Sequence, residues 1–177
     1  MQNKSSDTYI PAEDTFFLAD HIKGEKGQAA LEIGTGSGYL AKILEKNFEL
    51  VIATDIDYFA LQGQDDRIKN GICCTGADAL SAKFDLIVCN LPYLPTEKIV
   101  DRTTDGGPEG LEIPFQIIQS AGARLKPNGK MLYLTSSLAN YEKLIEKTKS
   151  LGFEAAILAK KKLFFEDLIL VESLKLD

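Results

Sequence analysis

Three glycines alternate with other residues in the stretch Glu32-Ile33-Gly34-Thr35-Gly36-Ser37-Gly38-Tyr39-Leu40. The apolar run before them is typical of a buried strand, and the apolar residues after them recur at helical spacing. Glycine permits the positive φ angles of a sharp turn, and it lets a ligand approach the backbone without meeting a Cβ atom. The stretch therefore predicts a strand, a ligand-binding turn and a helix, which together form the first half of a βαβ unit.

The spacing of these glycines narrows the kind of ligand. Dinucleotide-binding proteins carry G-x-G-x-x-G, in which the last glycine lets the helix pack closely on the strand. Here Tyr39 takes that last position, so a cofactor bound through a pyrophosphate is disfavoured. S-adenosylmethionine, which has no phosphates, suits such a turn better. A tight turn that binds nothing is the structural alternative.

The rest of the chain alternates between helical and strand-like patterns. The last two strand-like runs follow each other with no room for a helix, so they must pair as a hairpin. These patterns predict an α/β fold, with a mostly parallel seven-stranded sheet, a C-terminal antiparallel hairpin, helices on both faces and a single domain over 1–177. The segment 94–112 has no clear period and reads as a long loop that is functional or disordered. We expect helices over about 13–24, 40–46, 58–69, 113–125 and 138–151, and strands over about 29–33, 50–54, 72–75, 84–89, 131–135, 153–160 and 164–173.

Composition disfavours several classes of function. The net charge of −6 over 177 residues argues against binding nucleic acid without sequence preference, which needs Lys and Arg facing phosphates. No apolar run reaches the roughly 18 residues of a membrane span, and the first residues lack the apolar core of a signal peptide. Cys73, Cys74 and Cys89 lie in apolar runs without metal-binding spacing. We therefore expect buried thiols, no metal site and a cytoplasmic location.

Acidic residues stand at the ends of three predicted strands. In a parallel sheet, ligands bind outside the carboxyl ends of the strands. Asp55 is placed to accept hydrogen bonds from two ribose hydroxyls, and its replacement by alanine should weaken cofactor binding at little cost to the fold. Asp78 could accept the exocyclic amine of an adenine ring, and Glu32 lies where an ammonium group would be favoured. Acids are also common at strand ends simply because loops are solvated.

The fourth strand ends in Asn90-Leu91-Pro92-Tyr93. Pro92 cannot continue a strand ladder and holds Leu91 in an extended conformation. The side-chain oxygen of Asn90 and a main-chain carbonyl could then converge on one –NH₂ group, while Tyr93 lies against a planar amide or base. The structural alternative is a proline turn with an exposed asparagine.

At this point the sequence resembles a known family. Residues 32–38, Asp55 and Asn90-Leu91-Pro92-Tyr93 are similar to motifs of class I S-adenosylmethionine-dependent methyltransferases that modify planar nitrogen. Two further segments resemble the HemK-like release-factor glutamine methyltransferases, in particular their short archaeal and eukaryotic branch, which lacks the N-terminal helical domain of the bacterial enzymes. These segments are Tyr9-Ile10-Pro11-Ala12-Glu13-Asp14-Thr15-Phe16-Phe17-Leu18 and Asp105-Gly106-Gly107-Pro108-Glu109-Gly110-Leu111-Glu112.

The resemblance implies a Rossmann-like fold, S-adenosylmethionine as cofactor, and methylation of the glutamine side chain in the Gly-Gly-Gln motif of a translation release factor. It also implies a small zinc-binding activator protein that extends the sheet, for which the predicted edge strand 72–75 is suited; an edge strand covered by its own helix is the structural alternative. The catalytic residues would be Asn90, Leu91, Pro92 and Tyr93. The cofactor contacts would be Asp14, Thr15, Glu32, Gly34, Thr35, Gly36, Gly38, Asp55, Asp78 and Asn90.

One departure from the family keeps other acceptors open. Leu91 stands where the family has the first proline of Asn-Pro-Pro-Tyr, and Asn-Leu-Pro-Tyr also occurs in ribosomal RNA adenine dimethylases. Methylation of adenine N6 in RNA or DNA is therefore the alternative enzymatic function. An oxidoreductase with a nucleotide cofactor and a non-enzymatic scaffold are further alternatives.

Overall fold

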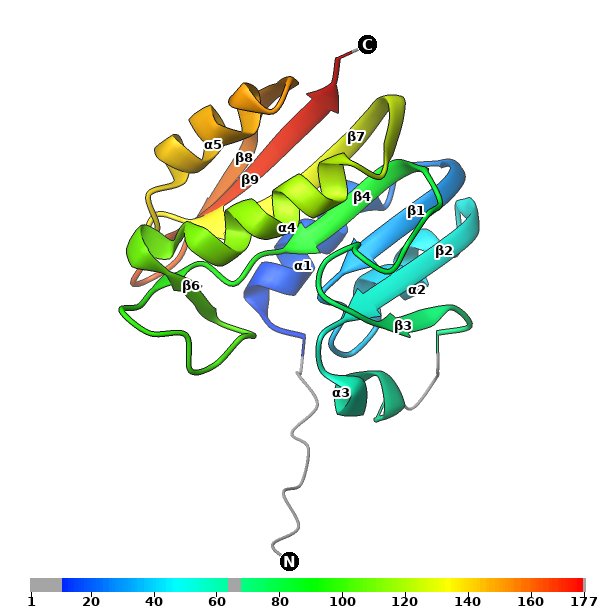
Figure 1. Ribbon diagram of the computed structural model, residues 1–177, viewed down its shortest axis with the longest axis horizontal. Helices are drawn as coiled ribbons and strands as arrows, with labels where there is room; N and C mark the ends of the chain where they lie inside the picture. Colours follow the sequence, from blue (N-terminus) through cyan, green and yellow to red (C-terminus); the bar gives the residue numbers. More distant parts are fainter. Residues whose placement is uncertain (1–10, 64–67, 177) are drawn as a thin grey trace, which may run out of the picture.

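The computed structural model describes residues 11–63 and 68–176. Its main feature is a seven-stranded sheet with the order β3-β2-β1-β4-β7-β9-β8 (Figure 1). The first five strands in this order are parallel, and β9 is antiparallel to both of its neighbours. The predicted sheet and its C-terminal hairpin are confirmed. The strands are β1 (Gly27–Ile33), β2 (Phe48–Asp55), β3 (Gly71–Cys73), β4 (Phe84–Asn90), β7 (Leu125–Ser136), β8 (Phe153–Lys162) and β9 (Asp167–Lys175).

The chain reverses its direction of progress across the sheet at β1. From β1 it proceeds to β2 and β3 on one side, then returns to place β4 and β7 on the other. Ile33 at the end of β1 pairs with Thr54 of β2 and with Cys89 of β4. The glycine turn after β1 therefore emerges between the carboxyl ends of β2 and β4, which is where α/β sheets bind their ligands.

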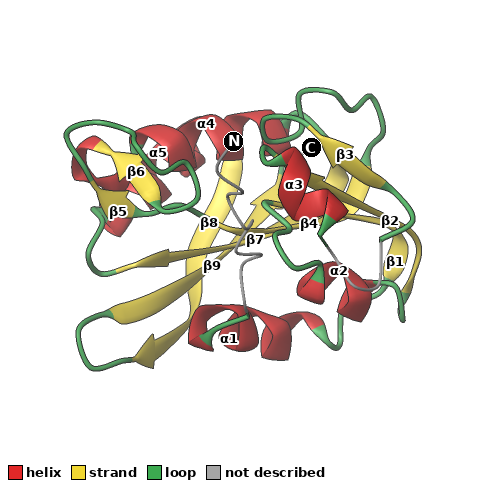
Figure 2. Cartoon of the chain, turned by 90° about the horizontal axis from the view of Figure 1, so that it is seen from below, coloured by secondary structure: helices red, strands yellow, loops and turns green. Residues whose placement is uncertain are grey.

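Helices cover both faces of the sheet, as predicted. Along β4, Leu86 and Val88 pack with the core under α1 and α2, whereas Ile87 and Cys89 pack with the core under α4 and α5. Figure 2 shows these two helix pairs on opposite sides of the strands. Alternate side chains of a strand point to opposite faces, so an apolar run of this kind serves two cores. The helices are α1 (Glu13–Ile22), α2 (Tyr39–Leu44), α3 (Tyr58–Gln62), α4 (Glu112–Gly122) and α5 (Tyr141–Ser150).

The segment 94–112 is not the structureless loop that its sequence suggests. It forms a second, two-stranded parallel sheet of β5 (Leu94–Pro95) and β6 (Asp105–Gly107), followed by the 3₁₀ turn η1 (Pro108–Gly110). The side chain of Asp105 accepts hydrogen bonds from the main-chain amides of Val100 and Asp101, at 2.8 and 2.9 Å. These contacts close the connection between β5 and β6, and no sequence periodicity reports them.

Two other expectations need correction. Pro127-Asn128-Gly129, which falls between the helix expected over about 113–125 and the strand expected over about 131–135, lies inside β7 as a bulge, because pairing with β4 moves from Phe84↔Leu125 to Leu86↔Lys130. Cys89 is buried as expected, but Cys73 is exposed because β3 is a three-residue strand at the sheet edge. Of the helix expected over 58–69, residues 64–67 lie outside the described residues.

Among residues 11–63 and 68–176, none of the helices has the length and apolar character needed to cross a bilayer.

Candidate active site

A cavity of about 420 Å³ opens at the carboxyl ends of the central strands. This volume falls within the range of small-molecule sites. The glycine turn, the ends of β2 and β4 and the segment after β3 form its walls, together with one face of α4 and the β5–β6 connection. Five of the residues predicted for the site line it: Gly34, Gly36, Asp55, Asn90 and Pro92.

The glycine turn has the geometry that its sequence predicts. Gly34, Gly36 and Gly38 have φ angles of 72°, 50° and 79°, a region in which side chains with a Cβ atom are strained. The main-chain amides of Gly34 and Thr35 both donate to the carbonyl of Thr54 on β2, at 2.8 and 3.0 Å. The turn is therefore tied to the neighbouring strand rather than suspended in solvent.

Asp55 fastens the same turn from the end of β2. One of its carboxylate oxygens, Oδ2, accepts the amide of Gly36 at 2.8 Å, and the other accepts the amide of Asp57 at 2.9 Å. Only 7% of the residue is exposed, and it lines the cavity. A carboxylate oxygen has two acceptor sites, so each oxygen can still accept a hydrogen bond from a ligand. The two main-chain contacts also mean that Asp55 supports the fold, which its sequence position does not reveal.

Glu32 lies beneath the turn and outside the cavity lining. Its Oε2 accepts hydrogen bonds from the Thr35 hydroxyl at 2.6 Å and from the amide of Ala41 in α2 at 2.8 Å. Burial raises the pKa of this carboxyl group to about 8, against the opposing effect of these two donors and with a further contribution from the negative charge of Asp55. In this structure Glu32 joins β1, the turn and α2.

Asp78 is also outside the cavity lining. Its carboxylate accepts the hydroxyl of Ser120 at 2.6 Å, and that hydroxyl oxygen accepts the amide of Ala77 at 3.0 Å. These bonds tie the segment after β3 to α4. The part of this segment that lines the cavity is slightly earlier, at residues 74–76.

Asn90 ends β4 with its side chain in an asymmetric environment. Its Nδ2 donates to Oδ2 of Asp14 at 2.8 Å. Its Oδ1 is buried and has no hydrogen-bond partner among the described residues. A buried amide oxygen without a partner is costly, so this atom is the prime candidate for contact with a ligand.

The other residues predicted for the site support it from outside the cavity lining. Leu91 is buried, and its amide donates to the carbonyl of Leu134 at 3.1 Å, a bond that a proline could not make. The hydroxyl of Tyr93 donates to Glu166 at 3.4 Å, in the connection between β8 and β9. Thr15 donates to Asp14 through its amide at 2.6 Å. Thr35 and Gly38 belong to the turn described above.

Sequence reasoning missed one wall of the cavity. This wall consists of the β5–β6 connection and the near face of α4. The α4 residues follow the apolar helical spacing of a core helix, and that spacing does not distinguish a core from a cavity wall. The missed residues are Ile99, Arg102, Thr103, Ile113, Gln116 and Ile117.

Comparison with known proteins identifies the family. Residues 12–164 match the model of the methyltransferase small domain. The chain belongs to this family. The glycine turn, Asp55 and Asn90 all lie within the matched residues, so the cavity described above is part of the methyltransferase domain.

Two relatives indicate which kind of methyltransferase the chain is similar to. The chain is 32% identical to a putative protein N5-glutamine methyltransferase of Methanocaldococcus jannaschii, over 96% of this chain and 93% of that protein. It is 28% identical to the methyltransferase HEMK2 of Mus musculus, over 84% and 80% of the two chains. These relatives confirm the resemblance to HemK-like methyltransferases that the motifs predicted.

Solved structures share the fold of this methyltransferase. Mtq2, from the E. cuniculi Mtq2–Trm112 complex responsible for methylation of the translation termination factor eRF1, superposes with a TM-score of 0.82 at 23% identity, covering 94% of this chain and 98% of that one. The N-methyltransferase NodS of Bradyrhizobium japonicum, in complex with S-adenosyl-L-homocysteine, has a TM-score of 0.68 at 14% identity, covering 93% and 89%. The Rossmann-like methyltransferase fold predicted from the sequence is confirmed.

Proposed function

We propose that this chain is an S-adenosylmethionine-dependent methyltransferase that modifies the side-chain amide of the glutamine in the Gly-Gly-Gln motif of a translation release factor. The observation that carries the proposal is the unpartnered oxygen of Asn90 at the cavity. A primary amide offers two N–H donors, and this oxygen can accept one of them.

The cavity fits S-adenosylmethionine. Its volume suits a small-molecule cofactor, and Asp55 retains acceptor capacity for the hydroxyls of a ribose. The positive-φ glycines leave the main chain of the turn open to a ligand, while Ile113 and Ile117 of α4 supply an apolar wall for an adenine ring. When bound, this cofactor supplies a methyl group on a sulfonium, which is an activated leaving group.

The chain's own residues act mainly by positioning the acceptor. An amide nitrogen is a weak nucleophile because its lone pair is delocalised, so acceptors on its N–H bonds are needed to stabilise the positive charge that develops there. Asn90 Oδ1 provides one acceptor. A main-chain carbonyl of the segment 90–93 would provide the second. Holding the two reacting atoms close in line can lower the barrier by about 7–11 kcal/mol.

Adenine is the second candidate acceptor, because it also presents a planar –NH₂ group and because Leu91 replaces the first proline of the motif. Two observations favour glutamine. The relatives that match almost the whole chain include a putative protein N5-glutamine methyltransferase, and the net charge of −6 opposes contact with a phosphate backbone. A release-factor substrate also implies that the protein acts in the cytoplasm.

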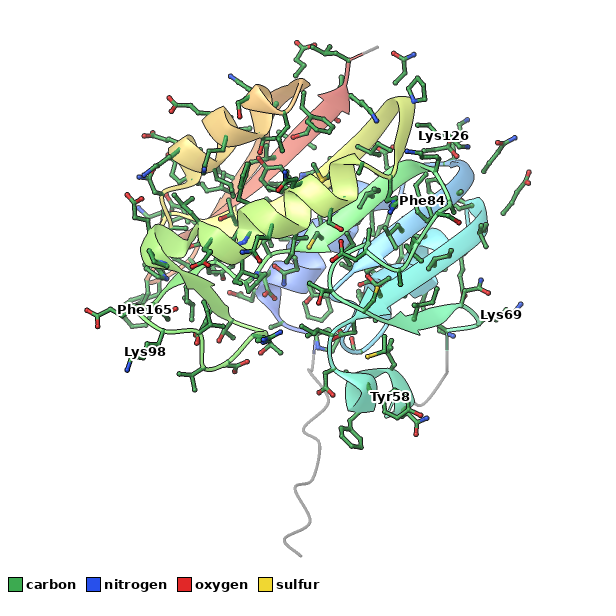
Figure 3. All side chains as sticks on the ribbon, in the orientation of Figure 1. Tyr58, Lys69, Phe84, Lys98, Lys126 and Phe165 are labelled. Atoms are coloured by element: carbon green, nitrogen blue, oxygen red, sulfur yellow. The ribbon has the colours of Figure 1, made fainter. Side chains whose placement is uncertain are left out.

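We further propose that a small activator protein binds at the β3 edge of the sheet, as the complex of Mtq2 with Trm112 suggests. β3 has only three residues, and it is the last strand of the sheet, pairing with β2 alone among the described residues (Figure 1). Exposed apolar residues gather nearby in the chain: Tyr58 and Phe59 of α3 are 53% and 67% exposed, and Tyr58 points away from the body of the molecule (Figure 3). Main-chain pairing with β3, together with burial of these rings, suits a partner that adds a strand.

The proposal is tested by single-turnover transfer from methyl-labelled S-adenosylmethionine, with the activator homologue co-expressed. The acceptors are a release factor, the same factor with its Gly-Gly-Gln glutamine changed to glutamate, and an adenine-containing RNA. We expect label only in the unaltered factor, and mass spectrometry should place it on the glutamine. Label in the RNA alone would favour the adenine function, and label in none of the acceptors would contradict the proposal.

A further inference from the structure

The contact between Asp14 and Asn90 joins two segments that are 76 positions apart in the chain. Asp14 lies in the first turn of α1, whereas Asn90 ends β4. Asp14 is half-buried and is absent from the cavity lining. It meets the site through the side chain of Asn90 rather than through the cavity itself.

The chemistry of this contact determines which way the Asn90 amide faces. A carboxylate accepts hydrogen bonds and has none to donate, so an amide oxygen placed against it would be repelled. The other carboxylate oxygen of Asp14 accepts the amide of Thr15 at 2.6 Å and its hydroxyl at 3.4 Å, which holds the carboxylate in place. Asn90 must therefore turn its –NH₂ group toward Asp14 and its oxygen away, and that oxygen is the one without a partner.

We propose that Asp14 is a positioning residue that fixes the orientation of the Asn90 amide, so that Oδ1 rather than Nδ2 faces the acceptor nitrogen. The catalytic consequence rests on the proposed function above, whereas the contact itself does not. The two ends of an asparagine amide have nearly the same shape, so packing alone selects weakly between them. If the Asn90 amide were turned by 180°, its –NH₂ group would face the N–H bonds of the substrate amide, donor against donor. The substrate amide would then lose the Asn90 oxygen as a hydrogen-bond acceptor during methyl transfer.

The negative charge of Asp14 has a second effect in the same direction. A hydrogen bond from Nδ2 to a carboxylate polarises the amide, which makes its oxygen a stronger acceptor because linked hydrogen bonds reinforce one another. The role proposed here for Asp14 is distinct from the direct cofactor contact that the family resemblance implies, which stays a prediction.

Asp14 also stands where an acidic residue favours a helix N-terminus, and this role must be separated from positioning. Glu13 provides the matched control, because it is an exposed carboxylate in the same first turn of α1. Glu13→Ala removes a charge from the helix end without touching Asn90.

The first measurement observes the contact without any methyl acceptor. The side-chain amide resonances of Asn90 are assigned in ¹H–¹⁵N spectra by their absence from Asn90→Ala, with S-adenosylhomocysteine bound. We expect Asp14→Ala to shift these resonances and to speed the exchange of their protons, whereas Glu13→Ala leaves them in place. Unchanged resonances in Asp14→Ala would overturn the proposal.

The second measurement compares single-turnover methyl transfer with cofactor affinity and thermal stability. We expect Asp14→Ala to lower turnover by about tenfold to a hundredfold, with S-adenosylhomocysteine affinity and melting temperature close to those of Glu13→Ala. Asp14→Asn should recover part of the loss, because its side-chain oxygen can still accept from Asn90. Wild-type turnover in Asp14→Ala, or an equal loss of cofactor affinity, would overturn the proposal.

The failure of the proposed function has a different signature. Wild-type protein would then transfer no methyl group to the release factor, before any variant is compared. The amide resonances would still decide the orientation, since they require no acceptor.

Discussion

The two sides of the cavity differ in how their polar atoms are satisfied. On the side of the glycine turn, Asp55 already holds two main-chain amides, and the amides of Gly34 and Thr35 are bonded to β2. On the side of β4, one end of Asn90 is bonded to Asp14 and the other end has no partner among the described residues. The hydrogen bonds of the first side hold its backbone in one conformation, whereas the second side retains an acceptor oxygen that no described residue bonds.

This difference separates binding from chemistry. A cofactor needs a preformed surface. The glycine turn, whose amides are already bonded to β2 and to Asp55, provides one before the cofactor arrives. Catalysis needs a group whose interaction is completed by the reacting atoms, and the Asn90 oxygen meets that requirement. The comparison predicts that changes on the glycine-turn side reduce affinity and stability, whereas changes at Asn90 reduce turnover.

Asn90→Ala gives the largest expected effect. Losing one preorganised contact to the reacting group should lower single-turnover methyl transfer by about 10²–10³, with cofactor affinity nearly unchanged by calorimetry. Asn90→Asp tests the same atom more finely, because it keeps an acceptor oxygen but places a second carboxylate against Asp14. Asn47→Ala is the control, since Asn47 is exposed and its side chain donates to the carbonyl of Lys23, far from the cavity lining. Near-normal turnover in a folded Asn90→Ala protein would remove the distinction between the two sides.

Gly110→Ala should disturb the Asn90 side through its backbone. Gly110 has a φ of 68°, and a Cβ atom there would overlap the carbonyl oxygen of Tyr93. Strain of this kind costs about 1–3 kcal/mol, and the overlap adds to it, so we expect a lower melting temperature and reduced turnover. Alanine substitutions at two other glycines separate backbone strain from overlap. Gly152 tests strain alone, because it has a φ of 88° with nothing within 4 Å of the added atom. Gly24 has neither constraint. If the three alanine variants melt together, close packing on Tyr93 is not what holds this segment.

Asp55 probes the glycine-turn side. Asp55→Ala should weaken S-adenosylmethionine binding by about 1.5–3 kcal/mol, the usual worth of hydrogen bonds to a charged group. It should also lower the melting temperature, because the amides of Gly36 and Asp57 lose their acceptor. Asp55→Asn keeps one acceptor oxygen and should lose less of both. Calorimetry measures the cofactor affinity and thermal melts measure the stability of the same samples. A loss of affinity without any loss of stability would show that the fold does not need the hydrogen bonds from Asp55 to the amides of Gly36 and Asp57.

Glu32 gives the smallest expected effect, on the pH dependence of stability. The pKa of its carboxyl group is raised to about 8 in the folded protein, chiefly by burial, from an ordinary value of 4.5. Between these values the folded protein holds a proton that the unfolded chain releases, so this group's contribution to stability falls as the pH rises from about 5 to 8. Glu32→Gln should flatten that part of the melting-temperature profile. A variant profile parallel to the wild type would show that Glu32 is ionised in the fold.

The sequence by itself determined the sheet, the terminal hairpin and the glycine turn. Each of these follows from local patterns: apolar runs that alternate with helical spacing, two strands without room for a helix, and glycines whose positive φ angles exclude other residues. The strand-end position of Asn90 could be predicted in the same way, because a proline two residues later ends the ladder.

Only the tertiary structure decided what these side chains contact. Glu32 and Asp55 both end strands beside the same turn, yet one is buried under it and the other lines the cavity. In the segment 94–112, Gly106 and Gly110 fit closely against the carbonyls of Pro92 and Tyr93. Helix α1 brings Asp14 to Asn90 from the start of the chain. Hydrogen bonds between residues distant in sequence leave no periodic pattern, since they depend on where whole elements pack.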